Sequence, residues 1–329
     1  MYEKFFQLPV NPFLLTPDPH YAAPTQSYRE AFAALIYALH WRKGFVSLSA
    51  EPGTGETTLL SAVMRAQSAD EARFSYVINP TLTPSEFVEA IMLDFGIANV
   101  PASKAQRLQL LEAFLLRTKA EGRTAVLIID EAHRLTAELL EELRFLTNFE
   151  NAQTKFLQVV LGGQPEMDAT LNREDLRQVR QRISLRLTLS TLTCEETGYY
   201  LRHRWAKSGT TEPLPFSEEA ISAIARVANG TPRTINVLCD NSLALAYGLG
   251  VRIMLPVHVA EVASSLQMDR SRTPAKPEQV VAIEASIALP ETSRFQSIRP
   301  LKSIRPEKQP LIFRIASRLG FRVANPVTE

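Results

Sequence analysis

The feature that most constrains this 329-residue chain is a short glycine-rich loop between an apolar run and a helical pattern. Residues 44–48 predict a strand, and residues 59–64 predict the start of a helix. Between them, residues 49–58 read Ser-Ala-Glu-Pro-Gly-Thr-Gly-Glu-Thr-Thr. This order of strand, glycine loop and helix is the context of a P-loop, whose pattern is G-x-x-x-x-G-K-[ST]. The backbone N–H groups of such a loop surround phosphate oxygens at the positive end of the following helix.

The loop departs from this pattern at two positions. Ala50 stands where the first glycine is expected, and Glu56 stands where a lysine is expected. Gly55 and Thr57 keep the pattern, and Gly53 and Thr58 remain beside them. The lysine of a P-loop carries its positive charge to the β- and γ-phosphates. The alternative interpretation of the stretch is an ordinary glycine turn between a strand and a helix.

Composition narrows the class of protein. Hydrophobic residues make up 45% and charged residues 22% of the chain, as in ordinary globular proteins. No apolar run of about 18 residues occurs, so no transmembrane helix is expected. The first residues lack a signal-peptide pattern, so no signal peptide is expected. Cys194 and Cys239 have no metal-ligand spacing and fit a reducing, cytoplasmic compartment. Residues 271–329 carry ten basic and five acidic side chains, so the rest of the chain has a net charge of about −4.

Strand and helix patterns alternate through the first 190 residues, which predicts an α/β domain with a parallel sheet. The predicted strands are residues 45–49, 74–78, 124–129, 156–161 and 183–189. The unbroken apolar run at 124–129 is typical of an interior strand. It ends at Asp130 and Glu131, and ligands bind beyond the carboxyl ends of such strands. We therefore expect the strands at 45–49 and 124–129 to end side by side, with Thr57 and Asp130 facing one cleft. A solvated helix start is the alternative for the two acids.

The remainder of the chain has a different character. Residues 191–269 contain only helical patterns, with helix starts expected at Thr193, Ser217, Thr231 and Pro256, and they predict a small helical domain. Residues 270–329 hold seven prolines and are expected to begin as a disordered linker. Residues 311–323 regain helical spacing with arginines on one face. They predict a basic amphipathic helix for peripheral contact with an anionic membrane or a partner, unless the segment folds back or stays disordered.

Six short motifs along residues 1–268 together resemble a known family. They are Tyr2, Phe5, Phe6 and Leu8 with Asn11-Pro12-Phe13 and Thr16-Pro17-Asp18-Pro19; Arg42-Lys43-Gly44-Phe45; Ile129-Asp130-Glu131-Ala132-His133; Gly163-Gln164-Pro165-Glu166; Leu176-Arg177 with Arg180-Gln181-Arg182-Ile183; and Gly230-Thr231-Pro232-Arg233 with Ile235-Asn236. In this order they resemble the ExeA-type AAA+ ATPases of the general secretion pathway. The resemblance implies a P-loop AAA+ domain with a five-stranded parallel sheet and helices on both faces, followed by an all-α lid domain. It also implies a homo-oligomeric, Mg²⁺-dependent ATP switch or motor in envelope, secretion or polysaccharide-export assembly, cytoplasmic or peripheral at the inner membrane.

The resemblance implies a role for each matching residue. The nucleotide would be bound by Glu51, Pro52, Gly53, Thr54, Gly55, Glu56, Thr57, Thr58 and Arg233. Thr57 and Asp130 would hold Mg²⁺, and Glu131 would activate the attacking water. Gln164 would be sensor 1 and Arg233 sensor 2, while Arg180 or Arg182 would reach the nucleotide of a neighbouring subunit. The alternatives are a plain surface acid for Glu131, a turn residue for Gln164 and a solvated basic turn for Arg180 and Arg182. His133 is expected to be structural.

Glu56 bears directly on the activity. Two unit charges about 4 Å apart interact by roughly 4 kcal/mol at an effective dielectric of 20. Replacing attraction by repulsion therefore predicts impaired hydrolysis, unless Glu56 turns away or takes a proton. A natural pseudo-ATPase, a deliberate substitution and a sequence error each account for the residue. Two other functions are alternatives to the motor: a non-hydrolysing scaffold and a DNA-binding transposition-helper ATPase. The net negative charge of residues 1–270 disfavours the DNA-binding alternative, because duplex binding usually needs a basic surface.

Overall fold

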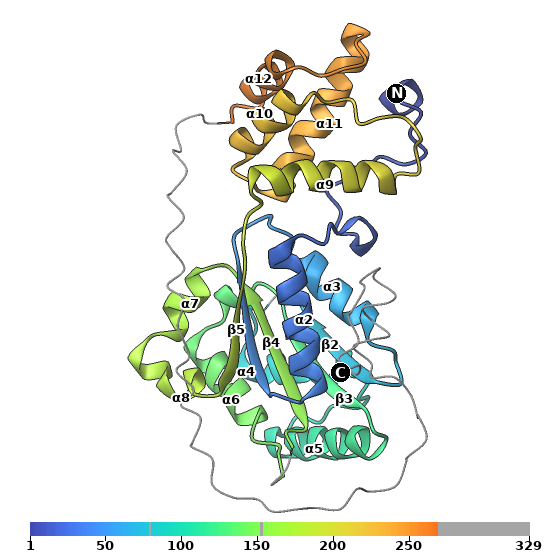
Figure 1. Ribbon diagram of the computed structural model, residues 1–329. Helices are drawn as coiled ribbons and strands as arrows, with labels where there is room; N and C mark the ends of the chain where they lie inside the picture. Colours follow the sequence, from blue (N-terminus) through green and yellow to red (C-terminus); the bar gives the residue numbers. More distant parts are fainter. Residues whose placement is uncertain (79, 152–153, 269–329) are drawn as a thin grey trace, which may run out of the picture. The chain divides into compact units, whose positions relative to one another are not determined.

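The computed structural model describes residues 1–78, 80–151 and 154–268, which contain a five-stranded parallel sheet, its covering helices and a bundle of further helices (Figure 1). The strands are β1 (Phe45–Ala50), β2 (Ala72–Val77), β3 (Thr124–Ile129), β4 (Leu157–Gly163) and β5 (Ile183–Leu189). The helices among them are α1 (Tyr2–Phe5), α2 (Gln26–His40), α3 (Glu56–Ala66), α4 (Pro84–Asp94), α5 (Lys104–Ala120), α6 (Ala137–Leu146), α7 (Glu166–Leu171) and α8 (Arg177–Arg180). Short 3-10 turns are η1 (Pro19–Tyr21), η2 (Ala132–Arg134) and η3 (Glu174–Leu176).

The strand order is β2-β3-β4-β1-β5, and every neighbouring pair is parallel. The predicted parallel sheet is therefore confirmed, and β3 is an interior strand paired on both sides. The expectation that the strands at 45–49 and 124–129 are neighbours is wrong, because β4 lies between β1 and β3. An apolar strand pattern predicts burial on both faces but does not specify which strand lies beside it. β5, whose pattern alternates, is an edge strand that pairs only with β1.

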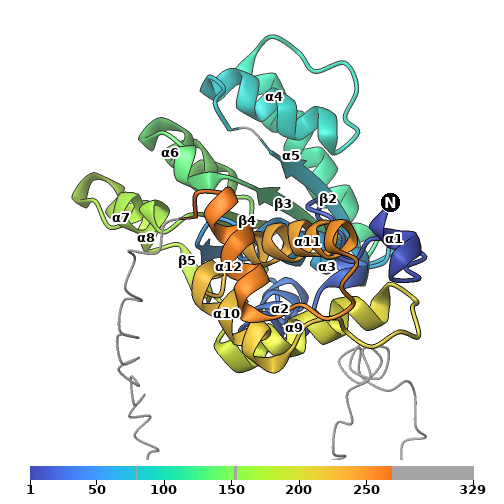
Figure 2. The ribbon, with the colours of Figure 1, turned by 90° about the horizontal axis from the view of Figure 1, so that it is seen from above.

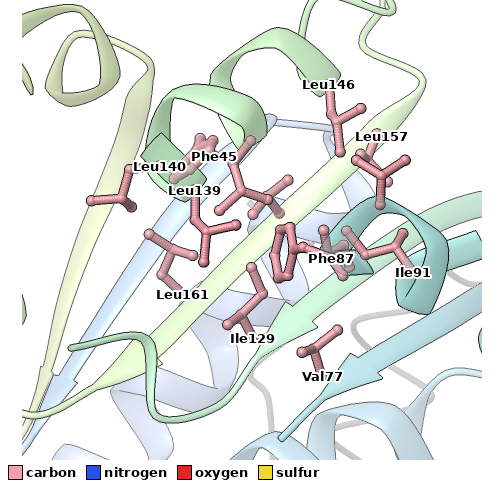
Figure 3. Packing of buried hydrophobic residues seen from close by; sticks show 14 of the residues in the cluster. Phe45, Val77, Phe87, Ile91, Ile129, Leu139, Leu140, Leu146, Leu157 and Leu161 are labelled. Carbon is pink, nitrogen blue, oxygen red and sulfur yellow. The ribbon is translucent and has the colours of Figure 1, made fainter. Parts of the chain in front are cut away.

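Each face of the sheet is covered by its own helices. Alternate strand side chains, among them Phe45, Ile129 and Leu161, pack with Phe87 of α4 and Leu139 of α6 in the larger apolar core (Figure 3). Helix α4 packs on β2 and α5 packs on β3, and the two helices touch each other (Figure 2). Helices α2 and α3 contact β5 and β4 on the opposite face. Because the strands are parallel, their carboxyl ends lie at one edge of the sheet, where the loops that follow them begin.

Four helices follow the sheet: α9 (Cys194–Lys207), α10 (Glu218–Ala228), α11 (Pro232–Leu249) and α12 (Pro256–Ser265). A capping box forms at Thr193, the first of the predicted helix starts, and another forms at Thr83 before α4. These four helices enclose a second apolar core, which also contains Phe6 and Phe13 from the N-terminal segment. The division of the chain near residue 190 stays a prediction, and the N-terminal aromatics belong to the helical core.

Two expectations concern residues that the structure does not describe. The linker expected at 270–308 and the basic helix expected at 311–323 both lie outside the described residues. Across 1–78, 80–151 and 154–268, no helix is long and apolar enough to cross a membrane.

Candidate functional site

The glycine-rich loop joins the end of β1 to the start of α3 and depends on two glycines. Gly53 has φ +83° and Gly55, which precedes the first residue of α3, has φ +107°, a region that favours glycine. A Cβ atom at Gly53 would lie 2.8 Å from Cβ of Arg233. The loop is thus shaped both by its backbone conformation and by the close approach of α11. Its free N–H groups lie at the N-terminus of α3, where an anion is stabilised.

A cavity of about 360 Å³ opens beside this loop. Its lining includes every residue predicted to bind nucleotide, Mg²⁺ or the attacking water, namely Glu51 through Thr58, Asp130, Glu131, Gln164 and Arg233. The N-terminal segment also contributes, from Leu14 to Thr25. A volume of this size is typical of a small-molecule site, for which about 300 to 1,000 Å³ is usual.

Asp130 is buried in this cleft and accepts three hydrogen bonds from three parts of the chain. The Thr57 hydroxyl donates to Oδ2 at 3.0 Å, and the Tyr76 hydroxyl donates to the same oxygen at 2.6 Å. The backbone N–H of Glu131 donates to Oδ1 at 2.9 Å. A hydroxyl and a carboxylate so close together are oxygen ligands of the kind that Mg²⁺ binds. The donor set at this end of the cleft therefore fits Mg²⁺.

Tyr76 was not anticipated from the sequence. It lies on β2, opposite Ile128 in the pairing with β3, so its side chain reaches the residue that follows β3. Burial, followed by the hydrogen bond to Asp130, raises the pKa of the Tyr76 hydroxyl, which remains a proton donor. The available signal was a tyrosine near the end of a strand predicted in the same parallel sheet, but strand order was needed to use it.

Glu56, the first residue of α3, turns its carboxyl group against β4. Oε1 is so close to Gly162 that a side-chain carbon there would collide with it. This buried oxygen has no hydrogen-bond partner among the described residues. Burial, then the charge of Asp130 and then that of Glu131 raise the pKa of Glu56 to about 8. At neutral pH most Glu56 side chains therefore carry a proton, which reduces the predicted repulsion but supplies no positive charge.

Side-chain contacts connect the ends of β3 and β4 through Glu131, His133 and Gln164. The backbone of Glu131 is left-handed, with φ 56°, and 47% of its side chain is exposed. Its Oε2 lies 3.5 Å from Nδ1 of His133, and that nitrogen accepts a bond from the N–H of Gln164 at 3.4 Å. A Cβ atom at Gly163 would lie 2.9 Å from the backbone nitrogen of His133, so glycine permits this close approach. His133 thus has a structural position, while Glu131 faces the cleft.

Arg180 and Arg182 do not line the cavity. Arg180 donates to the carbonyl oxygen of Asn172 at 3.0 Å, and Arg182 donates to Oδ1 of Asn148 at 2.6 Å. Arg182 also lies 3.8 Å from Glu150. The structure therefore does not bring either arginine to the cleft of its own chain.

Two arginines of the helical part do line the cavity. The N–H of Arg233, in the first turn of α11, donates to the carbonyl oxygen of Gly53 at 3.0 Å. Arg204, which sequence reasoning missed, is buried on α9 and donates to the carbonyl oxygen of Pro12 at 2.5 Å. Its guanidinium also lies 5.0 Å from the centre of the Tyr21 ring. Arg204 therefore fastens the N-terminal segment to the helices beside the cleft, a long-range contact with no local sequence signal.

Comparison with known proteins identifies the class. The AAA domain family matches residues 40–171. General secretion pathway protein A of Aeromonas hydrophila is 38% identical over 254 residues, which cover 76% of this chain and 46% of that protein. The chain belongs to the ExeA-type AAA family. It spans about half the length of the curated relatives it matches.

Solved structures share the fold at lower identity. Cdc6p from Pyrobaculum aerophilum gives a TM-score of 0.60 at 19% identity, covering 78% of this chain and 71% of that one. The Aeropyrum pernix ORC2 protein in its ADPNP–ADP complexes gives a TM-score of 0.57 at 17% identity, covering 76% and 72%. At these identities the likeness shows the fold alone, a P-loop AAA sheet followed by helices.

Proposed function

We propose that this chain binds ATP with Mg²⁺ in the cleft beside the glycine loop and acts as a nucleotide-dependent switch with slow or absent hydrolysis. The observation that carries the proposal is the pairing of Thr57 with Asp130, 3.0 Å apart, in the cavity that the loop and Arg233 also line. A P-loop, a hydroxyl and a strand-end carboxylate are the parts that position a nucleotide and its metal in such enzymes.

The proposed roles follow from position in the cleft. Backbone N–H groups at the start of α3 would hold phosphate oxygens, and Thr57 with Asp130 would hold Mg²⁺, which neutralises phosphate charge when bound. Glu131 would orient the attacking water. Gln164, at the end of β4, would contact the water or the last phosphate. Arg233 would approach the nucleotide from α11, and Arg180 or Arg182 would do so from a neighbouring copy in a homo-oligomer.

Glu56 supports the second half of the proposal. Phosphoryl transfer depends on positioning and on charge stabilisation of the transferred group. Among the described residues that line the cavity, Arg204 and Arg233 are the cations, and Arg204 is held by the N-terminal segment. A protonated Glu56 permits an anion to bind nearby but cannot replace the stabilisation that a lysine would give. A non-hydrolysing scaffold is the limiting form of this function.

Calorimetric titration with Mg-ADP tests the binding half of the proposal. We expect one nucleotide per chain for the natural protein and tighter binding for Glu56→Lys, whose side chain would carry a positive charge. Glu56→Gln is the matched control, because it is neutral and nearly isosteric with the protonated acid, and it should bind like the natural protein. Absence of binding by all three folded proteins would contradict the proposal.

The assembly that such a switch would serve is inferred from the relative. The matched relative is named for the general secretion pathway, and the match covers about half of that protein. On this basis we propose secretion or envelope assembly as the setting, at or near the inner membrane. Co-purification of partners in the presence of ADP and of ATP would test this. Retardation of duplex DNA that weakens steeply with salt would instead favour a nucleic-acid role.

A further inference from the structure

Tyr76 is fixed at two points. Its hydroxyl donates to Oδ2 of Asp130 at 2.6 Å, and its backbone N–H donates to Oδ2 of Asp94, the last residue of α4, at 2.5 Å. β2 is one of the two edge strands of the sheet, so this N–H faces away from β3 and has no strand partner on that side. The second bond holds the strand end that carries the phenol ring. The hydroxyl of Tyr76 is thus presented to Asp130 from a well-anchored position.

The bond from Tyr76 is independent of the glycine loop. Of the three donors to Asp130, Thr57 belongs to α3, and the N–H of Glu131 belongs to the residue next to Asp130 itself. Tyr76 alone among these donors comes from another strand of the sheet. It can therefore hold the Asp130 side chain when nucleotide binding moves the loop or the start of α3.

The surroundings of Asp130 make this donor more important. Glu131 and Asp130 lie close enough together in the cleft for the charges of both to act on Glu56, and both line the same cavity. The described structure gives Asp130 no ion pair with a lysine or arginine, and its hydrogen bonds come from two hydroxyls and one N–H. Hydrogen bonds from neutral donors therefore take the place of cationic contacts in orienting this carboxyl group. Removal of the Tyr76 hydroxyl would leave Oδ2 with Thr57 alone.

We propose that Tyr76 is a positioning residue that sets the Mg²⁺ requirement of nucleotide binding by holding Asp130 in place. The inference rests on the proposed function, since it concerns Mg²⁺ that accompanies a nucleotide in this cleft. Removal of a group that hydrogen-bonds to a metal ligand typically lowers metal affinity by about 10- to 100-fold. Tyr76 would act through Asp130 and would not itself touch the nucleotide.

The test is a Mg²⁺ titration of the binding of a fluorescent ADP analogue. Tyr76→Phe keeps the ring and removes only the hydroxyl, and the control Tyr199→Phe removes the hydroxyl of an exposed tyrosine on α9. We expect the Mg²⁺ concentration at half-maximal binding to rise about 10-fold in Tyr76→Phe. Affinity at saturating Mg²⁺ should change by less than about 2-fold, and Tyr199→Phe should match the natural protein. A general structural defect would instead weaken binding at every Mg²⁺ concentration.

The outcomes separate this inference from the function on which it rests. Equal Mg²⁺ midpoints for Tyr76→Phe and the natural protein would overturn the inference and leave the proposed function intact. Absence of analogue binding at every Mg²⁺ concentration, by both the natural protein and Glu56→Lys, would overturn both. The thermal unfolding midpoint without nucleotide verifies that each variant is folded. If Tyr76→Phe is unfolded, the same titration of Glu56→Lys with and without Tyr76→Phe decides the matter, because tighter nucleotide binding stabilises the fold.

Discussion

Asp130 and Glu56 are two carboxyl groups of one cleft with opposite surroundings. Asp130 accepts three hydrogen bonds, from Thr57, Tyr76 and the N–H of Glu131. Glu56 has a buried oxygen without a partner, and its pKa is raised to about 8. A buried carboxyl group is stable as an anion only when donors surround it, and otherwise it takes a proton. The side of the cleft proposed to bind Mg²⁺ thus holds its carboxyl and hydroxyl groups together, while the side proposed to meet phosphate has a glutamate in place of a lysine.

This difference separates two properties that usually occur together in AAA proteins. In the proposed function, binding depends mainly on the loop backbone and on Thr57 and Asp130, which lie together in the cleft. Hydrolysis also requires positive charge near the transferred phosphoryl group, which Glu56 does not supply. Substitutions can restore that charge at Glu56, displace the Glu56 carboxyl group from β4, or remove the Thr57 hydroxyl beside Asp130.

The largest effect is expected from Glu56→Lys on ATP hydrolysis. Loss of one preorganised donor to a developing charge costs about 100- to 1,000-fold in rate in other enzymes, so restoring a lysine should raise phosphate release by about 100-fold. Steady-state phosphate release measures the rate, and Glu56→Gln should stay as slow as the natural protein. Adding Glu131→Gln to Glu56→Lys should remove the gain. If the natural protein and Glu56→Lys turn over ATP equally fast, the charge at position 56 does not limit hydrolysis.

The pH dependence of stability should report the proton on Glu56. Its pKa is raised from 4.5 to about 8 on folding, so the protonated form is favoured in the folded state. The stabilisation is fully present below about pH 4.5 and is lost as pH rises toward 8, by an amount on the order of a few kcal/mol.

Urea unfolding in metal-free buffer at several pH values measures this effect. Between pH 5 and 8 the natural protein should lose stability relative to Glu56→Gln, which cannot titrate, while Asp130 and Glu131 remain in both proteins. Parallel stability curves for the two proteins would show that Glu56 has the same pKa in the folded and unfolded states, which would contradict this prediction.

The position of the Glu56 carboxyl group can be tested from β4. Gly162→Ala introduces a methyl group where Oε1 of Glu56 lies, so either the carboxyl group moves or the fold is strained. The cost of Gly162→Ala should fall by about 1 kcal/mol when Glu56 is first changed to Ala, as expected for groups in contact. Gly248→Ala is the control, because no atom lies within 4 Å of its added Cβ, and it should show no such coupling. Additive unfolding free energies for Gly162→Ala and Glu56→Ala would place the carboxyl group elsewhere.

The last effect concerns the side of the cleft proposed to bind Mg²⁺. Thr57→Val keeps the shape of the side chain but removes the hydroxyl that bonds to Asp130. We expect about 10-fold weaker binding of ADP with Mg²⁺ and little change in the presence of a chelator. Thr57→Ser keeps a hydroxyl and should recover most of the Mg²⁺-dependent affinity. A loss that is equal with and without Mg²⁺ would mean that Thr57 contacts the nucleotide only.

The sequence predicted the parts of this site that follow from local pattern. Two glycines in a strand-loop-helix context and two acids after an apolar strand were sufficient to place Thr57 and Asp130 in one cleft. Strand order was not accessible in the same way, because an apolar run gives no information on its neighbours. For this reason β4 was not expected between β1 and β3, and Tyr76 was not expected beside Asp130.

The missing parts are contacts between residues far apart in the chain. The bond from Arg204 to Pro12 joins positions 192 residues apart, and neither residue marks the other in the sequence. The direction of the Glu56 side chain also depended on Gly162, which leaves room for it on β4. The sequence leaves open whether Glu56 turns away or takes a proton, and packing against β4 explains both, because it buries the carboxyl group without a hydrogen-bond partner.

A single-turnover reaction of the natural protein with labelled ATP measures nucleotide binding and hydrolysis in one experiment. Protein in excess over ATP is incubated with Mg²⁺, the bound nucleotide is isolated at successive times, and its ATP and ADP content is measured. We expect the natural protein to retain its nucleotide as ATP long after Glu56→Lys has converted its own to ADP. Conversion by the natural protein at the rate of Glu56→Lys would show that the missing positive charge does not limit hydrolysis.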